Sequence, residues 1–559
     1  MKSHQQQSIY TTLCRIFLLA GTFMLSGIGR SWGQTYANTQ TSGTYGCGVL
    51  GCSTTAVTNP ANAVSVSLLD SATLKSVDAV LGTTGGNAQI TLTFPSNLPS
   101  GATTYIKIGT PTNTNLVLGL LGVLGLVGSN IYVDAINSAS SVSTSSSNSV
   151  TIIKNAAGEQ FLYVKPPTAF GNYNALKIRV EAPTGLVSSV SLPVYYAVYD
   201  TTTTSCTQQP IYTNLGATSG VSVSLSTAVA SPELAIDAST ATASVLTTGA
   251  VAVGATTSQT IYFNGLSNST DEVRVLLSIP PSLLSLTLFS NINIQTYNGT
   301  TSTSTVQSVS NSLIGLNLLT LFGSNAIIPV YFKTTSPFDR VVISLGSFVA
   351  VTAPSVNVYD VKRVPGPPTF STLNSDTAYV CSGSSKSISA DAVAGSSFNW
   401  YASSSETVTT PFFTGNPYQT SNLTNDTVFY VARKNTNCSQ ESERVPVRVV
   451  VRALPTINIV TPLYQCIQQP TYSLVYNSAT NSPTFYSITW SGTAITQSFP
   501  NVNDVNLPSS PIPVVTPITA PAGAYSATLS VRNTNMCSTT YPITITIVPL
   551  PSPPSTSFQ

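Results

Sequence analysis

Ile543-Thr544-Ile545-Thr546-Ile547 alternates an apolar residue with threonine, and Ile90-Thr91-Leu92-Thr93-Phe94 and Val445-Pro446-Val447-Arg448-Val449 show the same alternation elsewhere in the chain. Side chains of a strand point to opposite faces of the sheet in turn, so a period of two buries one face and leaves the other in water. Threonine on the wet face suits a strand and adds polarity without charge. Long helical periodicity is absent. The chain is therefore predicted to be all-β, built from short-stranded sandwiches.

Charged residues are rare in this chain. Its 559 residues include 21 Lys or Arg and 19 Asp or Glu, and the only histidine is His4. Histidine is the commonest general base near neutral pH and a frequent metal ligand, so its loss with an export signal excludes the usual nucleophile–histidine and histidine–metal sites. The acidic residues are scattered and do not form the carboxylate pair that glycoside hydrolysis needs. The sequence predicts no catalytic, cofactor-binding or metal-binding residue, and thus no enzyme.

Residues 1–33 are predicted to be a signal peptide. Lys2 and Arg15 precede the apolar stretch 16–28, and Ser31 and Gly33 have the spacing that a signal peptidase accepts. The stretch is shorter than the about 20 residues that span a bilayer, which favours cleavage over a retained membrane anchor. Cleavage after Gly33 removes three basic residues and leaves 18 positive and 19 negative side chains. Such a near-neutral surface predicts neither a nucleic-acid partner nor an anionic membrane partner.

Four anchor sequences occur twice, in the same order, in the first half of the mature chain. They are Tyr36 to Gly43 with Tyr212 to Gly220, Asn59 to Val64 with Ser231 to Ile236, Ser129 to Ile131 with Ser290 to Ile292, and Val198 to Asp200 with Val358 to Asp360. A repeat of this length indicates a duplicated structural unit. Residues 34–207 and 208–363 are therefore predicted to be two related, jelly-roll-like β-sandwiches.

Proline-rich joints divide the second half into two smaller predicted sandwiches, residues 366–453 and 454–549. Each contains a strand that runs into an Asn-rich turn, 431–438 in the first and 530–537 in the second, which is a hairpin signature. Residues 550–559 are interpreted as a proline-rich tail or as a linker at which a longer protein is cut.

Seven cysteines remain once Cys14 is removed with the signal peptide. Each small sandwich holds two, so the disulfides predicted in an oxidising compartment are Cys381–Cys438 and Cys466–Cys537. The cysteines left over are Cys47, Cys52 and Cys206. Cys47 with Cys52 would close a short loop, whereas either of them with Cys206 would join the two ends of the first repeat. Both alternatives stay open, and one thiol has no mate.

Two resemblances to known families lie in the second half. Val380-Cys381-Ser382-Gly383, Phe398-Asn399-Trp400-Tyr401, the stretch 423–431 and Asn437-Cys438-Ser439 make residues 366–453 resemble the Ig-like domains of large secreted surface proteins of bacteria. Through the stretches 486–492 and 533–537, residues 454–549 resemble PKD-like domains, although the acidic glycine motif of ordinary PKD domains is absent. The resemblances imply a secreted or cell-surface protein of a gliding-type bacterium, with these modules as spacers or adhesive units.

Single aromatic residues in mid-strand usually lie in a core, so Trp400, Tyr430 and Trp490 are predicted to be structural core residues. In the first half, Pro232 to Asp237 resembles the opening of discoidin-like jelly rolls, which bind sugars or lipid headgroups through loops at one end. In the second repeat, Ala238 stands where the family has a glycine after the aspartate. In the first repeat, Ser65 stands in place of the aspartate itself. No binding residue is therefore carried over from that family.

The sequence predicts an exported, non-catalytic protein of the outer cell surface or the extracellular space that acts in adhesion or as a structural spacer. The alternative is a carbohydrate-binding protein that recognises polysaccharide through its N-terminal repeats. The expected partners are polysaccharide or surface proteins, with no nucleic acid and no membrane span after signal cleavage. A hydrolase ranks third, because it would need two facing carboxylates in a cleft.

Overall fold

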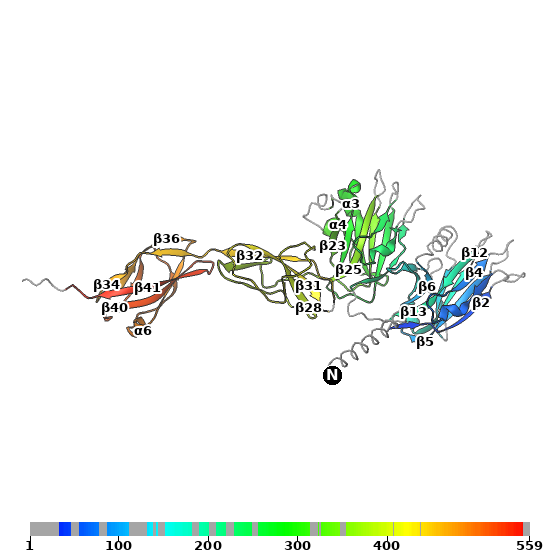
Figure 1. Ribbon diagram of the computed structural model, residues 1–559, viewed down its shortest axis with the longest axis horizontal. Helices are drawn as coiled ribbons and strands as arrows, with labels where there is room; N and C mark the ends of the chain where they lie inside the picture. Colours follow the sequence, from blue (N-terminus) through cyan, green and yellow to red (C-terminus); the bar gives the residue numbers. More distant parts are fainter. Residues whose placement is uncertain are drawn as a thin grey trace, which may run out of the picture. The chain divides into compact units, whose positions relative to one another are not determined.

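The computed structural model describes residues 33–45, 55–77, 86–110, 131–137, 141–143, 151–181, 189–200, 208–219, 229–248, 255–312, 322, 326–346, 354–405, 407–436 and 438–551. Residues 1–32 of the predicted signal peptide, the cysteines Cys47, Cys52 and Cys206, and residues 552–559 of the predicted tail lie outside the described residues. The chain divides into two compact units (Figure 1). Unit 1 comprises Met1–Gly366 with Asn437–Gln440, and unit 2 comprises Pro367–Thr436 with Glu441–Gln559.

The described chain is all-β, as predicted. The helices are short: α3 (Leu286–Asn291), α4 (Val309–Ser312), α6 (Thr493–Thr496), and the 3-10 turns η1 (Pro60–Val64), η2 (Thr168–Phe170), η3 (Pro232–Ala235) and η4 (Pro281–Leu283). The alternation that decides the fold is visible in strand β5 (Asn87–Leu98), where Ile90 and Leu92 are fully buried and Thr91 and Thr93 are half-buried.

The first sandwich of unit 1 is built from antiparallel sheets. One has the strand order β2 (Thr39–Tyr45), β5, β11 (Tyr173–Glu181), β7 (Ile131–Ile136), β8 (Ser141–Ser143). A second has the order β1 (Gln34–Tyr36), β13 (Tyr196–Asp200), β6 (Thr104–Gly109), β10 (Gln160–Val164), β9 (Thr151–Lys154). A smaller third sheet has the order β12 (Ser189–Val194), β4 (Ala72–Val77), β3 (Ala56–Thr58).

The second sandwich of unit 1 is also antiparallel. One of its sheets has the order β16 (Val229–Ala230), β17 (Ser244–Thr247), β25 (Ser355–Pro365), β19 (Asp271–Ser278), β23 (Ile328–Phe332). The other has the order β14 (Pro210–Asn214), β18 (Thr256–Phe263), β24 (Arg340–Gly346), β20 (Ile292–Asn298), β21 (Thr301–Ser302), with β15 (Ala217–Ser219) beside β18 and β22 (Gln307–Ser308) beside β20.

The two sandwiches share a strand order. The series β5-β11-β7 of the first corresponds to β18-β24-β20 of the second, and β13-β6-β10 corresponds to β25-β19-β23. The turns η1 and η3 are equivalent too, because each follows a residue in the left-handed region, Asn59 with φ 49° and Ser231 with φ 47°. The sequence anchor at Asn59 and Ser231 therefore marks equivalent places in two sandwiches of the same strand order. The exact domain limits stay predictions.

The sandwiches are joined by a sheet that passes from one to the other, which the sequence did not predict. Strand β9 pairs with β14 at Lys154↔Thr213 and Ile153↔Asn214, so the second sheet of the first sandwich continues into the second sandwich. Each sandwich retains its own buried core, drawn from residues 37–197 in one and 229–361 in the other. Unit 1 therefore consists of two sandwiches, each with its own hydrophobic core, that share one continuous sheet.

The Ig-like module of unit 2 has the strand order β26 (Thr377–Cys381), β32 (Val445–Arg452), β31 (Thr427–Asn435), β28 (Ser396–Tyr401), β29 (Phe413–Thr414), with β27 (Ser387–Ile388) and β30 (Tyr418–Gln419) as a second pair. Trp400 is fully buried, and its indole Nε1 donates to the Gly415 carbonyl oxygen at 3.0 Å. Tyr430 is only half-buried, because on β31 it points to the face opposite that of the buried Val431. The prediction that Tyr430 is a core residue is wrong.

The last module repeats this layout. Its main sheet has the order β34 (Tyr464–Cys466), β41 (Ser538–Val548), β40 (Gly523–Arg532), β37 (Phe485–Trp490), β38 (Val502–Asn506), and its smaller pairs are β33 (Thr456–Ile459) with β36 (Tyr476–Thr480) and β35 (Thr471–Leu474) with β39 (Ile512–Val515). Trp490 is 3% exposed and donates to the Pro500 carbonyl oxygen at 3.1 Å. In both modules the first strand of the main sheet, β26 or β34, pairs parallel with the last strand of the module.

This parallel pairing places the two cysteines of the Ig-like module at opposite ends of its sheet. Cys381 ends β26 opposite Arg452, the last residue of β32, whereas Cys438 lies before Val445, the first residue of that strand. The eight residues of β32 span about 25 Å at about 3.3 Å per residue. A disulfide needs Cα atoms within about 7 Å. The predicted bond Cys381–Cys438 is therefore wrong.

The predicted bond Cys466–Cys537 of the last module is wrong for the same reason, because its two cysteines lie at opposite ends of the main sheet. Cys466 ends β34 opposite Val548, and Cys537 immediately precedes Ser538 at the other end of β41. The structure instead joins Cys381 to Cys537, with the Cα atoms 5.5 Å apart. Cys438 is also disulfide-bonded, and Cys466 is free and exposed. The Cys381–Cys537 bond therefore links two neighbouring modules rather than the strands of one module.

Further contacts surround this bond between the modules. The Arg452 guanidinium lies 4.1 Å from the centre of the Tyr379 ring and donates to the Asn535 side-chain oxygen. The buried Asn533 accepts from the backbone of Cys537 at 3.1 Å and donates to the Ala453 carbonyl oxygen at 3.3 Å. The Asn-rich turn of the last module is thereby held against the end of the Ig-like module.

Thiol chemistry tests this connectivity. Among the described cysteines, only Cys466 is expected to react with a maleimide in the native, unreduced protein, since the others are bonded. Proteolysis without reductant is expected to release a cross-linked peptide that contains Cys381 and Cys537. After reduction, alkylation of both should appear in the mass spectrum. Recovery of a Cys466–Cys537 peptide would contradict the connectivity.

Candidate functional site

A cluster of aromatic rings lies on the shared sheet of unit 1 and crosses from one sandwich to the other. Its rings are Tyr36, Tyr105, Phe161, Tyr163, Tyr196, Tyr212 and Tyr262, and we call it the ring cluster. Tyr105 packs on Tyr212 with ring centres 4.5 Å apart, and Tyr163 packs on Tyr262 at 5.6 Å. In each of these two pairs one ring comes from each sandwich, so aromatic packing holds the sandwiches together.

Polar contacts follow the same junction. Lys154 of β9 and Glu233 of η3 form an ion pair at 3.0 Å. The Arg340 guanidinium of the second sandwich lies over the Tyr262 ring at 5.2 Å and donates to the Tyr163 hydroxyl of the first at 3.4 Å. These contacts fix where the ends of the strands lie around the ring cluster.

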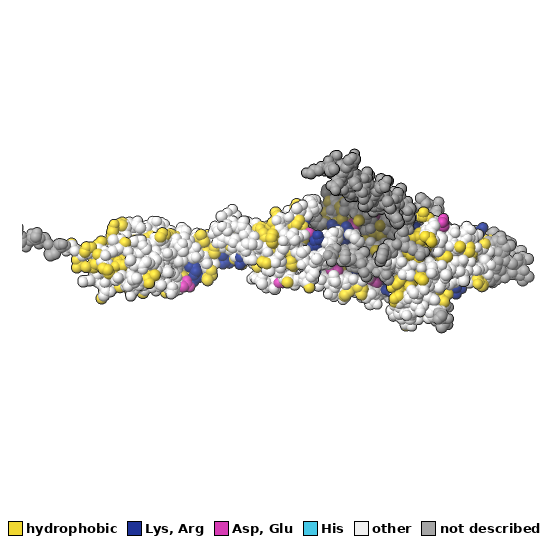
Figure 2. All heavy atoms as spheres, turned by 60° about the horizontal axis from the view of Figure 1, so that its bottom comes forward, with side chains coloured by type: hydrophobic (Ala, Val, Ile, Leu, Met, Phe, Trp, Pro, Cys, Tyr) yellow, Lys and Arg dark blue, Asp and Glu magenta, His cyan; other side chains and the backbone are white. Residues whose placement is uncertain are grey.

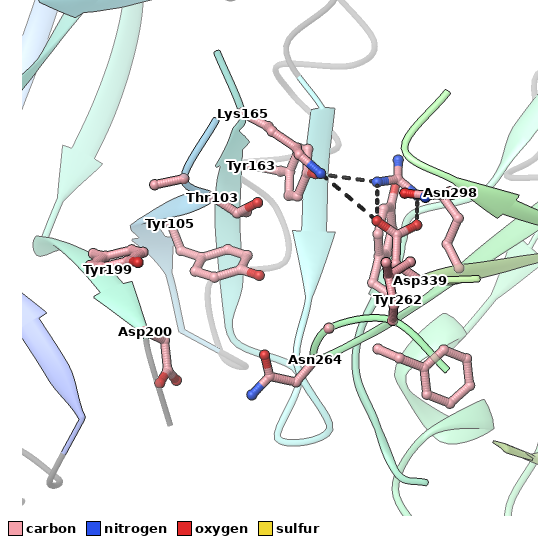
Figure 3. A pocket seen from close by; sticks show the side chains of 15 residues that line it. Thr103, Tyr105, Tyr163, Lys165, Tyr199, Asp200, Tyr262, Asn264, Asn298 and Asp339 are labelled. Carbon is pink, nitrogen blue, oxygen red and sulfur yellow. Dashed lines mark hydrogen bonds and ion pairs between the residues drawn. The ribbon is translucent and has the colours of Figure 1, made fainter. Parts of the chain in front are cut away.

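A pocket of about 330 Å³ opens at this junction (Figure 3). The first sandwich contributes Ala102, Thr103, Tyr105, Tyr163, Lys165, Tyr199 and Asp200, and the second contributes the stretch 262–266, Asn298, Asp339 and Arg340. Figure 3 shows Tyr199 and Asp200 on one side of the pocket and Lys165 and Asp339 on the other. The side chains that line it come from the ends of strands far apart in the sequence.

The pocket holds both signs of charge. Asp339 accepts from Arg340 at 2.8 and 3.2 Å, and Lys165 lies 3.9 Å from the same carboxylate. Burial tends to lower the pKa of Arg340, but hydrogen bonding to Asp339 and the nearby phenols of Tyr163 and Tyr262 raise it overall. The guanidinium is therefore charged and is engaged by Asp339.

The tyrosines around the pocket are held in the neutral form. Burial raises the pKa of Tyr262 from 10.0 to about 12, against the lowering effect of Arg340. Burial also raises the pKa of Tyr105 and of Tyr212 far above the ordinary value of tyrosine. Their hydroxyl groups are therefore protonated at physiological pH and can donate hydrogen bonds.

These shifts predict a loss of stability in alkali. The unfolded chain releases the phenol protons near pH 10, whereas folded Tyr105, Tyr196, Tyr212 and Tyr262 retain theirs. Their contribution to the free energy of unfolding is present below about pH 10 and decreases as the pH rises through the folded values. Arg363, with its pKa lowered by burial to about 10, acts in the opposite sense, but it is one group against several. The urea midpoint of unit 1 should fall between about pH 9 and about pH 11, as tyrosinate absorbance rises. An unchanged midpoint would contradict the burial of these rings.

Residues singled out by the discoidin-like resemblance do not reach this pocket. The Asp237 carboxylate accepts from the Ser239 backbone at 2.9 Å and from the Thr242 hydroxyl at 2.7 Å, so it caps its own turn. Nothing in the sequence marked the pocket itself, because no motif unites its residues. In the described part of the chain, no group of three or more His, Cys, Asp and Glu gathers as metal ligands would. Within the same residues, no helix is both long enough and apolar enough to cross a membrane.

Three solved structures are similar to parts of this chain. A β-1,2-glucanase from Parabacteroides distasonis is 9% identical with a TM-score of 0.17, and the match covers 55% of this chain and 33% of the glucanase chain. The adhesin domain of Epf from Streptococcus pyogenes is 12% identical with a TM-score of 0.15, covering 37% of this chain and 76% of that domain. The FN1–FN3 domains of chicken CNTN1 are 11% identical with a TM-score of 0.19, and the match covers 52% of this chain and 94% of the CNTN1 chain. At these TM-scores the likenesses carry no argument about function.

No curated protein matches the sequence. One family model does, that of the "Ig-like domain CHU_C associated", which matches residues 365–452. The match lies on the module that contains Trp400 and β26 to β32. Residues 365–452 are therefore an Ig-like domain, of a kind typical of surface proteins.

Proposed function

We propose that this chain is an exported, non-catalytic protein of the cell exterior that acts in adhesion. Unit 1 supplies the recognition surface, and unit 2 is a spacer made of the Ig-like domain and a PKD-like module. The observation that carries the proposal is the Cys381–Cys537 bond between the two modules of unit 2.

A disulfide between neighbouring modules suits a protein that works outside the cell. Disulfides persist in oxidising compartments, and cytosolic thiols are kept reduced. This bond adds a second covalent connection beside the chain at the joint, so it limits bending between the modules without adding to the core of either. A spacer benefits from such a bond, whereas a catalytic site gains nothing from it.

The surface chemistry of the chain agrees with a non-catalytic role. Figure 2 shows a surface on which charged side chains are few and scattered among uncharged ones. The only histidine is His4, within the predicted signal peptide. Recognition by such a surface depends on hydroxyl, amide and aromatic groups, which serve binding better than proton transfer.

The location of the protein can be tested on intact cells of the source organism. Brief treatment with a non-penetrating protease should remove the chain from the cells, and the recovered protein should contain oxidised Cys381 and Cys537. A cytosolic protein should serve as the control and should stay intact. Protection of the chain from the protease, with both cysteines reduced, would contradict the proposal.

The pocket of unit 1 favours a second candidate function, carbohydrate binding by the N-terminal repeats. Tyrosine rings, amides and carboxylates line one pocket, which therefore offers both apolar ring surface and hydrogen-bonding groups. This function is compatible with adhesion, since an adhesive protein can attach through polysaccharide.

A further inference from the structure

The pocket at the junction of the sandwiches has the size of a small-ligand site. Its volume of about 330 Å³ is at the lower end of the about 300–1,000 Å³ that ligand sites occupy. Both sandwiches line it, so it exists only when the repeats are assembled on their shared sheet. A ligand of one or two six-membered rings matches this volume better than an extended polymer does.

Its aromatic wall suits a sugar ring. Tyr163 and Tyr262 come from different sandwiches, are half-buried, and lie with ring centres 5.6 Å apart. The half-buried Tyr199 lines the pocket as well. Each tyrosine offers an apolar ring and a hydroxyl at its tip. A pyranose has the complementary build, with a face of C–H groups and a rim of hydroxyl groups.

The polar groups of the wall fit neighbouring hydroxyl groups. Asn264 and Asn298 carry planar amides with donors and an acceptor side by side. Asp200 adds carboxylate acceptors, and one of its oxygens also accepts from the Gln34 side chain at 3.1 Å. Vicinal hydroxyls of a sugar present donors and acceptors at a similar spacing.

The charges of the pocket favour a neutral ligand over an acidic one. Lys165 and Arg340 are matched by Asp200 and Asp339. The Arg340 guanidinium is already bound by Asp339 through two hydrogen bonds, and Lys165 lies beside the same carboxylate. A ligand carboxylate would have to displace Asp339 to gain a bidentate contact with Arg340.

We propose that this pocket binds a neutral saccharide of one or two pyranose rings, which rests on the recognition role proposed for unit 1. The tyrosines pack against the sugar face, and Asp200, Asn264 and Asn298 bind its hydroxyl groups. Asp339 holds Arg340 in place beside Tyr262 and leaves the site neutral.

The test uses the full mature chain, residues 34–559, and titration calorimetry. The probes are cellobiose, laminaribiose, maltose, mannobiose and lactose, with digalacturonic acid as the acidic comparison. Leu266 lines the pocket and is 51% exposed, so Leu266→Trp should fill the mouth of the pocket without disturbing a core. Leu286→Trp is the matched control, because Leu286 is 65% exposed on α3 and does not line the pocket.

We expect saturable binding of at least one neutral disaccharide. Leu266→Trp should weaken it by about tenfold or more, Asn298→Ala by about three- to tenfold through loss of hydrogen bonds, and Leu286→Trp by less than about twofold. Circular dichroism of each variant checks that it is folded.

Three results would overturn the inference: no binding of any neutral disaccharide, binding that is equal in Leu266→Trp and in the original chain, or binding of digalacturonic acid alone. These results leave the proposed function standing if the protein is found on the cell exterior. Absence from the cell exterior would count against the proposed function itself, whatever the calorimetry gives.

Discussion

Tyr105→Ala is expected to lower the free energy of unfolding of unit 1 by about 3–5 kcal/mol, as large-to-small replacements in aromatic cores do. Tyr105 is 8% exposed and packs on Tyr212 of the second sandwich at 4.5 Å and on Tyr163 at 6.1 Å. Removal of the Tyr105 ring should eliminate its contacts with rings of both sandwiches. Because a typical domain is stable by only about 5–15 kcal/mol, the effect is large enough to separate the unfolding of the two sandwiches.

Two matched variants show whether the ring is responsible. Tyr105→Phe keeps the ring and should cost less than about 1 kcal/mol. Tyr45→Ala removes a 53% exposed ring from β2 of the same sandwich and should change stability by about 0.5 kcal/mol at most. After signal cleavage the remaining tryptophans, Trp400 and Trp490, belong to unit 2, so an unfolding transition seen by circular dichroism but not by tryptophan emission belongs to unit 1. Equal effects of Tyr105→Ala and Tyr45→Ala would show that the ring cluster does not hold the sandwiches together.

Arg363→Ala is also expected to lower the free energy of unfolding of unit 1 by about 3–5 kcal/mol, because it leaves a cavity where a large side chain is fully buried. Arg363 is 0% exposed, and its guanidinium lies 4.4 Å from the centre of the Phe263 ring and 5.2 Å from that of Phe338. It also donates to the Gly265 carbonyl oxygen at 2.6 Å, in the segment that lines the pocket. Chemical denaturation at neutral pH measures the loss.

Arg363→Met distinguishes packing from charge. Burial lowers the pKa of Arg363 to about 10, which shows that its charge is costly to bury. Methionine fills much of the same space without a charge, so this variant should cost no more than about 1.5 kcal/mol. A loss in Arg363→Met as large as in Arg363→Ala would mean that the charge and its hydrogen bond to Gly265 contribute more than the packing between the two rings.

The fold class could be predicted because it depends on local patterns. The apolar–threonine alternation of β5 and β41 places one face of each strand in a core whatever its neighbours are. The internal repeat was visible because the anchor at Asn59 and Ser231 needs the same left-handed backbone before the same turn in both copies. Strand alternation and turn conformation each depend on a few consecutive residues, so they can be predicted from the sequence.

The cysteine pairing could not be predicted from spacing, since it depends on strand direction. Had β26 paired antiparallel with β32, Cys381 and Cys438 would lie near one end of the sheet. The observed parallel pairing separates them and brings Cys381 to the joint with the next module, where Cys537 lies in the turn before β41. The direction in which the first strand of the main sheet pairs with the last strand decides which cysteines can meet, and it is parallel in both modules.

The pocket could not be predicted for a related reason. Its residues come from strand ends of both sandwiches, and the pairing of β9 with β14 that brings them together has no counterpart in the sequence pattern. The tyrosines of the ring cluster look like ordinary strand residues when read singly. Only the shared sheet places Tyr163 beside Tyr262 and Arg340.

A competition experiment shows whether unit 1 is the part of the chain that recognises a surface. The binding of the full mature chain to immobilised polysaccharides and matrix proteins would be measured. Residues 34–363 or residues 366–549 would be added as a soluble competitor. We expect saturable binding that is blocked by residues 34–363 and unaffected by residues 366–549. Equal competition by residues 366–549, or no saturable binding to any surface, would contradict it.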